Sequence, residues 1–173
     1  MPGMKHALTL AALTFAAAPA LAQAQGYVRV QDAKLPFSVD LPKGWVGLKT
    51  NDGLAGITAA SAAKPPAAMI RLIFIPKNGK TVNLPVELAA FEKSVQADGT
   101  KLSRLTEKSV AYGGVSGIER TYNMTIKGQA YKMRLWFGNG AKNFYSFQHI
   151  NTTAGYAKTD PAFTRALTSL KFR

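Results

Sequence analysis

Five short segments in the first half of the chain have the hydrophobic pattern of β-strands. Two alternate apolar and polar residues clearly, and two more do so weakly on either side of the turn signal Asn51-Asp52-Gly53. The fifth is apolar at nearly every position, which is typical of a central strand covered on both faces. In chain order the segments are 28–30, 35–41, 46–49, 56–60 and 69–75.

A helical period replaces the alternation after residue 83. Four apolar residues spaced four, three and four apart form one stripe of a helix; they are Leu84, Leu88, Phe91 and Val95. Pro85 near the start and Gly99 just past the end occupy the usual positions of these residue types. A helix is therefore expected between about residues 84 and 97.

A second, shorter helix is expected near the end of the chain. Asp160 is the expected N-cap and Pro161 the first helical position, and apolar residues recur on one side as far as Leu170. A last extended piece is expected at 170–173.

Three strand-like runs lie between the two helices, at 117–126, 130–137 and 143–150. The turn signal Lys127-Gly128 joins the first two runs, and Gly138-Asn139-Gly140-Ala141 joins the last two. The runs therefore predict an antiparallel meander, and the domain as a whole is expected to be of the α+β class.

The turns predict which residues face each other in this meander. A two-residue loop at Lys127-Gly128 places Tyr122 opposite Met133, and centring the next turn on Asn139-Gly140 places Leu135 opposite Phe144. With these registers the apolar residues share one side, as expected of a core-facing sheet: Ile118, Tyr122, Met124, Tyr131, Met133, Leu135, Phe137, Phe144 and Ile150. Arg120 is also on that side, and we expect its stem to pack near an edge while its head reaches water.

The opposite side of the meander combines cations with aromatic rings. Arg134 is expected opposite Tyr145, and Lys132 opposite Phe147, with Trp136 and His149 nearby. Rings beside cationic groups can hold an anionic or sugar-bearing ligand, so the candidate ligand-binding residues are Lys132, Arg134, Trp136, Tyr145 and His149. The alternative is that the terminal helix covers this face and its aromatic residues form a second core.

The first residues have the pattern of a secretory signal peptide. Lys5 and His6 precede an apolar run at 7–18, and Pro19-Ala20-Leu21-Ala22 then offers small residues at alternating positions. The run is shorter than the roughly 20 residues that a transmembrane helix needs, so no transmembrane anchor is expected. We expect cleavage of residues 1–22, which leaves a single domain at 23–173; a cut two residues later and a buried N-terminal helix are the alternatives.

The charge is strongly positive and uneven. The 173 residues carry 22 Lys and Arg against 9 Asp and Glu, a net charge of +13. Residues 101–173 hold 12 basic and 3 acidic groups, a net +9, whereas residues 23–100 hold 9 and 6, a net +3. This field is either a solubilising surface or an attraction for an anionic partner.

The residue inventory excludes several chemistries. There is no cysteine, which excludes disulfides, thiol nucleophiles and cysteine-ligated metals. His149 is the only histidine left after residue 22, so sites built from several histidines cannot form, and no serine lies in a Gly-x-Ser-x-Gly elbow. The scattered carboxylates show no metal-binding spacing. We therefore expect no metal site, no cofactor and no catalytic residue.

Parts of the chain resemble the PsbP-like superfamily, also called the Mog/PsbP fold, which includes small exported bacterial proteins of the DcrB kind. The matching parts are Phe37-Ser38-Val39-Asp40-Leu41-Pro42-Lys43-Gly44-Trp45, the meander around Tyr122, Tyr131 and Tyr145, and the closing segment 163–172. The resemblance implies an antiparallel sheet sandwiched between helices, an α/β/α arrangement. Members of the superfamily mostly act as accessory or binding subunits without a shared catalytic motif, so the resemblance implies no functional residue.

These observations lead to one main hypothesis. The chain is expected to be an exported, soluble, non-enzymatic binding or accessory protein of the periplasm or the extracellular space. Its basic sheet face would recognise an anionic envelope polymer, a lipid head group or a protein partner, whereas export disfavours nucleic acid. The alternatives are a secreted hydrolase that uses His149 or paired carboxylates, and a structural subunit of a larger complex.

Overall fold

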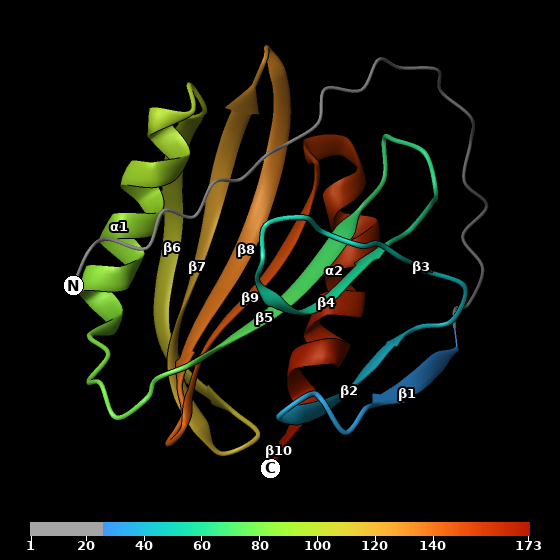
Figure 1. The fold of residues 1–173 in the computed structure, drawn as a ribbon. Coiled ribbons are helices and arrows are strands. Elements are labelled where there is room, and N and C mark those ends of the chain that lie inside the picture. The colour runs from blue at the N-terminus through green and yellow to red at the C-terminus, as the bar shows by residue number, and fades with distance from the viewer. Residues whose placement is uncertain (1–25) are drawn as a thin grey trace.

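The computed structural model describes residues 26–173, which form two antiparallel sheets and two helices (Figure 1). The larger sheet has seven strands in the order β3-β4-β5-β9-β8-β7-β6, and the smaller has three in the order β1-β2-β10. The elements are β1 Tyr27–Gln31, β2 Phe37–Pro42, β3 Val46–Gly47, β4 Ala55–Ala60, β5 Met69–Pro76, α1 Leu84–Ala97, β6 Lys101–Tyr112, β7 Val115–Ile126, β8 Gln129–Asn139, β9 Asn143–Thr152, α2 Thr153–Thr168 and β10 Lys171–Phe172. The predicted signal peptide at 1–22 lies outside the described residues. None of the helices within residues 26–173 is long and apolar enough to cross a membrane.

The large sheet forms the middle layer of the molecule. Helix α1 lies on one face, and α2 with the small sheet lies on the other, as Figure 1 shows. Each face has its own hydrophobic core: Leu88, Phe91 and Val95 of α1 pack on the first, and Phe163 and Leu167 of α2 on the second. The fold is of the α+β class with an antiparallel sheet between helices, so the predicted class is confirmed.

Helix α1 begins and ends where the sequence indicates. The Asn83 side chain accepts a hydrogen bond from the Val86 backbone N–H at 3.2 Å and so caps the helix, with Pro85 in the first turn. Gly99, just beyond the helix, has a φ of +80° that glycine adopts without strain.

Helix α2 begins eight residues before the predicted start, so the predicted N-cap at Asp160 is wrong. The hydroxyl of Thr152 accepts from the Gly155 N–H at 3.2 Å and caps the helix there. Pro161 therefore lies inside the helix, where it removes one backbone donor. Asp160 instead directs its carboxylate at the sheet, where it binds Arg134.

The register of the first hairpin is confirmed and that of the second is wrong. Tyr122 lies opposite Met133 as predicted, but Leu135 lies opposite Gln148 rather than Phe144. The second turn comprises residues 140–143, closed by a hydrogen bond from the Gly140 N–H to the Asn143 carbonyl at 3.0 Å, and so is centred two residues later than predicted. The error is even, so every side chain keeps its predicted face. The opposing pairs change, however: Arg134 faces His149 and not Tyr145, and Lys132 faces Asn151 and not Phe147.

The predicted core face is confirmed. All nine apolar residues assigned to it belong to the α1-side core or pack against it. Arg120 lies on this face as expected, but its head does not reach water: the side chain is 9% exposed and forms ion pairs with Glu92 of α1 at 2.8 Å and Glu107 of β6 at 2.6 Å. Two carboxylates thus compensate a cation that the sequence alone suggested would be hydrated.

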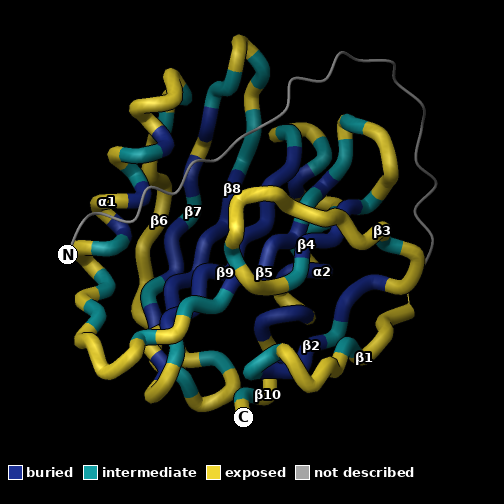
Figure 2. The backbone as a smooth tube through the Cα atoms, in the orientation of Figure 1, coloured by how far each residue is buried: buried dark blue, intermediate teal, exposed yellow. Residues whose placement is uncertain are grey.

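Strand β6 was not predicted. Its twelve residues, Lys101–Tyr112, are mostly exposed because it forms an edge of the sheet (Figure 2), so they lack the apolar alternation of a half-buried strand. A register shift between Arg104 and Thr106 further disrupts the pattern.

Candidate functional site

The structure buries four of the five candidate ligand-binding residues. Trp136 and His149 are 0% exposed, Tyr145 is 3% and Arg134 is 8%, whereas Lys132 is half-buried. Helix α2 packs against β8 and β9, which carry these residues. The structure therefore has the second of the two arrangements considered from the sequence, a face covered by the terminal helix. Ligand binding by these five residues stays a prediction.

The aromatic members belong to the α2-side core. The Trp136 ring lies 5.5 Å from Phe147, and Tyr145 lies 5.6 Å from Phe147 and 4.5 Å from Phe172, measured between ring centroids. The Trp136 Nε1–H donates to the Val110 carbonyl at 3.2 Å, which satisfies the one polar group of the ring.

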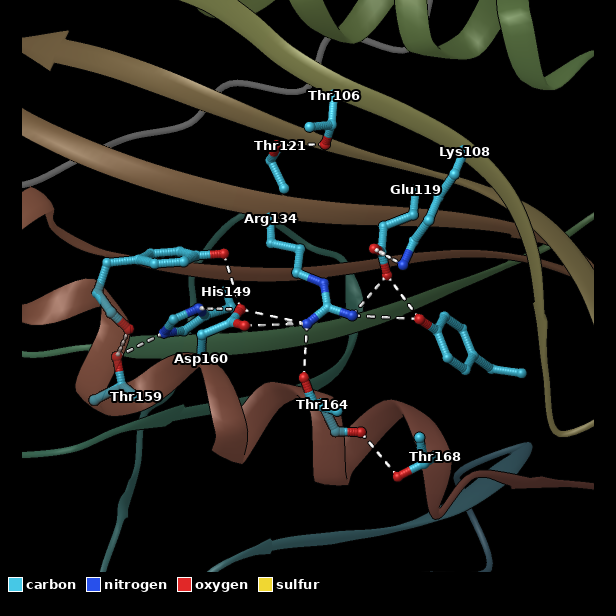
Figure 3. A network of polar contacts seen from close by, with 12 residues as sticks. Thr106, Lys108, Glu119, Thr121, Arg134, His149, Thr159, Asp160, Thr164 and Thr168 are labelled. Carbon is cyan, nitrogen blue, oxygen red and sulfur yellow. Dashed lines mark hydrogen bonds and ion pairs between the residues drawn. The ribbon is translucent and has the colours of Figure 1, made fainter.

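Of the charged candidates, Arg134 belongs to a buried polar network between the sheet and α2, shown in Figure 3. Arg134 is at its centre. Its Nη2 donates to Glu119 Oε2 at 2.9 Å and to the Tyr112 hydroxyl at 3.3 Å, and its Nη1 donates to Thr164 Oγ1 at 2.7 Å and to Asp160 Oδ1 at 3.3 Å. The guanidinium thus connects helix α2 with strand β7 and with Tyr112, the last residue of β6.

This network fixes the charges of its members. Burial alone would raise the pKa of Glu119, but hydrogen bonds from Arg134, Lys108 and Tyr112 outweigh burial and lower the pKa of this carboxyl. Burial and the hydrogen bond to Glu119 raise the pKa of Tyr112 to about 12. At neutral pH the carboxylate is therefore ionised and the phenol is neutral.

His149 is held neutral beside this network. Burial lowers the pKa of His149 to about 4, with only partial opposition from Asp160. The Nε2 atom lies 2.9 Å from Thr159 Oγ1, and which of these two atoms donates depends on the tautomer of the imidazole. Nδ1 has no hydrogen-bond partner and lies 3.8 Å from Asp160 Oδ1.

The burial, pKa shifts and ion pairs of Glu119, Asp160 and His149 can be compared with what the hydrolase alternative requires of a catalytic group. A general acid needs a carboxyl with a raised pKa that touches substrate, whereas Glu119 has a lowered pKa and is 4% exposed. Glu119 and Asp160 do come together, but the Arg134 guanidinium lies between them and keeps both in ion pairs. His149 has no exposed atom through which to reach a substrate. Among residues 26–173 no three potential metal ligands of the His, Asp or Glu type gather.

Part of the same sheet face is left open. Beyond α2, towards the β6 edge, the side chains on this face are exposed or half-buried and mostly hydroxyl, amide or ammonium groups. We call this surface the β6–β8 strip; it comprises Lys101, Ser103, Thr106, Lys108, Thr121, Asn123, Thr125, Ala130 and Lys132. Thr106 and Thr121 hydrogen-bond to each other across β6 and β7.

The strip carries uncompensated positive charge. Lys108 pairs with Glu119 at 2.9 Å, but Lys101 and Lys132 form no ion pair with any residue in 26–173; Lys132 Nζ instead lies 5.2 Å from the centre of the Tyr156 ring. The four β6 positions of the strip escaped sequence reasoning because β6 was not predicted, whereas Thr121, Asn123 and Lys132 were assigned to this face from the sequence. For Lys101 and Lys108 the only sequence signal was the excess of basic residues after position 100.

Comparison with known proteins establishes the fold but no closer relationship. No protein-family model matches the chain, and no curated protein matches it in sequence. Solved structures do match, and they show that the chain has the PsbP-like fold. The resemblance seen in the sequence is thereby confirmed at the level of fold.

Three of these structures span almost the same length as this chain. Cyanobacterial PsbP (CyanoP) of Synechocystis sp. PCC 6803 is similar with a TM-score of 0.66 and 11% identity, over 93% of this chain and 99% of CyanoP. LpqN of Mycobacterium tuberculosis, a protein involved in cell envelope biogenesis, gives 0.61 and 12% over 86% and 91%. PA94 of Pseudomonas aeruginosa, a protein of unknown function, gives 0.59 and 13% over 85% and 97%.

Proposed function

We propose that this chain is an exported, non-enzymatic accessory protein that binds an anionic component of the cell envelope through the β6–β8 strip. The observation that carries the proposal is the pair of exposed-to-half-buried cations Lys101 and Lys132, which no carboxylate of residues 26–173 neutralises, on an open face rich in hydroxyl and amide groups. Such a face can offer both charge and hydrogen bonds to a polymer that carries anionic groups and hydroxyls.

The surrounding charge supports this assignment. The three acidic residues of 101–173 are Glu107, Glu119 and Asp160, and each is already engaged by an arginine. They therefore reduce the positive field around the strip less than free surface carboxylates would. The basic residues of 101–173 therefore attract an approaching anion. The three carboxylates do not form a free acidic patch that would repel it.

The predicted signal peptide and the fold comparisons support a role in the envelope. Removal of residues 1–22 on export would bring the basic half to the compartment where anionic polymers and lipid head groups are abundant. LpqN, whose fold is similar, is involved in cell envelope biogenesis in its own organism. A protein partner with an acidic surface would use the same electrostatics and is the second form of this proposal.

Binding to isolated envelope polysaccharide and to anionic phospholipid vesicles at rising salt tests the proposal. We expect binding at low ionic strength that weakens progressively towards about 0.5 M salt, because exposed charges are screened within a few ångström there. Neutral vesicles of phosphatidylcholine are the control for apolar adsorption. Absence of binding to both anionic materials, or binding that does not respond to salt, would contradict the proposal.

A further inference from the structure

Three polar side chains of the β6–β8 strip have hydrogen-bonding groups that the fold itself does not use. Within residues 26–173, the side chains of Ser103, Asn123 and Thr125 form no hydrogen bond with any other residue. Ser103 and Asn123 are exposed and lie opposite each other on β6 and β7, and the half-buried Thr125 lies two residues further along β7 on the same face. Their hydroxyl and amide groups can therefore donate to a ligand and accept from it.

The two unneutralised cations of the strip are the cross-strand neighbours of these groups. Lys101 lies opposite Thr125, and Lys132 lies opposite Asn123. Opposed side chains of antiparallel strands have Cβ atoms about 5 Å apart, so an ammonium group and an unused hydroxyl or amide adjoin each other in both places. A ligand on the strip therefore meets a positive charge and a hydrogen-bonding group together, at two positions.

The strip is an open surface rather than a pocket. It is open towards β6, which is an edge strand of the sheet, and Lys132 Nζ marks its border with α2, 5.2 Å from the centre of the Tyr156 ring. From residue 121 to residue 125 the strip is about 14 Å long, and from β6 to β8 it is about 10 Å wide. A chain longer than the strip can lie on it and continue past the β6 edge.

Little apolar surface accompanies these groups. Leu105 is the one exposed large apolar residue of β6, β7 and β8, and it lies at the register shift of β6. Amphipathic segments that bind bilayers combine lysines with apolar side chains that enter the lipid. The strip combines lysines with hydroxyl and amide groups instead, which favours a sugar polymer over a lipid surface.

Resting on the proposed function of the strip, we propose that its ligand is an acidic polysaccharide. The carboxylates of such a chain bind Lys101 and Lys132, and its hydroxyls exchange hydrogen bonds with Ser103, Asn123 and Thr125. An acidic sugar carries a carboxylate and hydroxyls on one ring, which matches the pairing of an ammonium with a hydroxyl or amide on neighbouring strands. A carboxylate polymer without hydroxyls, or a lipid head group, would use the lysines alone.

The test compares alginate, a polysaccharide with a carboxylate on every sugar, with polyacrylate, a carboxylate polymer without hydroxyls, at equal ionic strength. The variant Ser103→Ala/Thr125→Val removes two hydroxyls that have no partner in the protein, so its melting temperature should stay close to that of wild type. We expect it to bind alginate about 5- to 50-fold more weakly, because two hydrogen bonds to the ligand are lost. Its affinities for polyacrylate and for vesicles of phosphatidylserine and phosphatidylcholine should be unchanged.

The matched control is Ser109→Ala/Ser116→Ala, which removes exposed hydroxyls from the other face of β6 and β7 and should bind alginate like wild type. An alginate affinity of Ser103→Ala/Thr125→Val equal to that of wild type would overturn the proposal. An equal loss for polyacrylate, or a loss for vesicles alone, would overturn it as well. Charge reversal of the two lysines is a separate result: if it abolishes binding while the hydroxyl variant binds normally, the strip is an anionic site but not one for a polysaccharide.

Discussion

The Nη2 atom of Arg134 lies 2.9 Å from Glu119 Oε2, and the two side chains are 10% and 4% exposed. The other end of the same guanidinium contacts Asp160 of α2 at 3.3 Å. A single buried cation therefore holds a strand carboxylate and a helix carboxylate together. The helix that covers the predicted ligand face is fixed to that face by this contact and by the apolar residues around Phe163.

Replacing Arg134 with methionine should destabilise the protein strongly. The substitution keeps most of the apolar stem but leaves Glu119 and Asp160 without their shared cation, and breaking a buried ion pair from one side lowers the free energy of unfolding by about 3–5 kcal/mol. Urea denaturation measures the change. Arg104→Met is the control, because Arg104 forms an exposed ion pair with Glu107 and should lose less than about 1 kcal/mol. Equal losses in the two variants would show that the network does not fix α2.

His149 should make the folded state sensitive to moderate acid. Burial lowers its pKa to about 4, whereas the unfolded chain binds the proton near pH 6.5. The unfolded state therefore holds more protons between these values, so stability falls as the pH drops from about 6.5 to about 4, by about 3 kcal/mol in total. Below pH 4 both states are protonated and this contribution no longer changes.

The variant His149→Gln should lose most of that pH dependence. Glu119 and Asp40 also have lowered pKa values, but they begin to destabilise the fold only below about pH 4.5, where the unfolded carboxyls take up protons. Unfolding by urea at pH 7 and at pH 5 therefore isolates the histidine. NMR titration of the folded wild type gives the pKa directly, and a value near 6.5 would disprove the account of His149.

Gly138 should not tolerate alanine. A Cβ atom there would lie 2.1 Å from the six-membered ring of Trp136, which is fully buried and packed against Phe147. Neither ring can shift without disturbing the core, so we expect Gly138→Ala to lower the free energy of unfolding by about 1–3 kcal/mol. Gly47→Ala is the control, because a Cβ at Gly47 meets no atom within 4 Å. A loss in Gly138→Ala no larger than in Gly47→Ala would contradict this packing.

Sequence patterns predicted the elements that carry a strong period and missed those that do not. The stripe from Leu84 to Val95 identified α1 because a helix that covers a sheet must be apolar on one side. Strand β6 has no such requirement, since its edge position leaves most of its side chains in water. The β6 half of the β6–β8 strip was missed for the same reason, whereas its β7 and β8 residues were placed on the correct face.

For the predicted ligand site, the sequence pattern could predict which face the side chains share but not whether that face is covered. Alternation placed Lys132, Arg134, Trp136, Tyr145 and His149 on one face correctly, because the error in the second hairpin was an even number of residues. Whether that face is open depends on where α2 begins and on the partners of Arg134. Asp160 looked like a helix cap because Pro161 follows it, and only the tertiary contact with Arg134 explains its position inside the helix.

The affinity of a charge-reversed strip for anionic envelope material tests the proposed function most directly. The variant Lys101→Glu/Lys132→Glu changes the strip, and Lys34→Glu/Lys43→Glu makes the same change in net charge at exposed lysines outside it. We predict that the first variant binds about 10- to 100-fold more weakly than wild type, because each lysine near an anionic surface contributes about 1 kcal/mol, while the second stays close to wild type. Equal affinities of the two variants would show that binding follows net charge alone and would contradict a site on the β6–β8 strip.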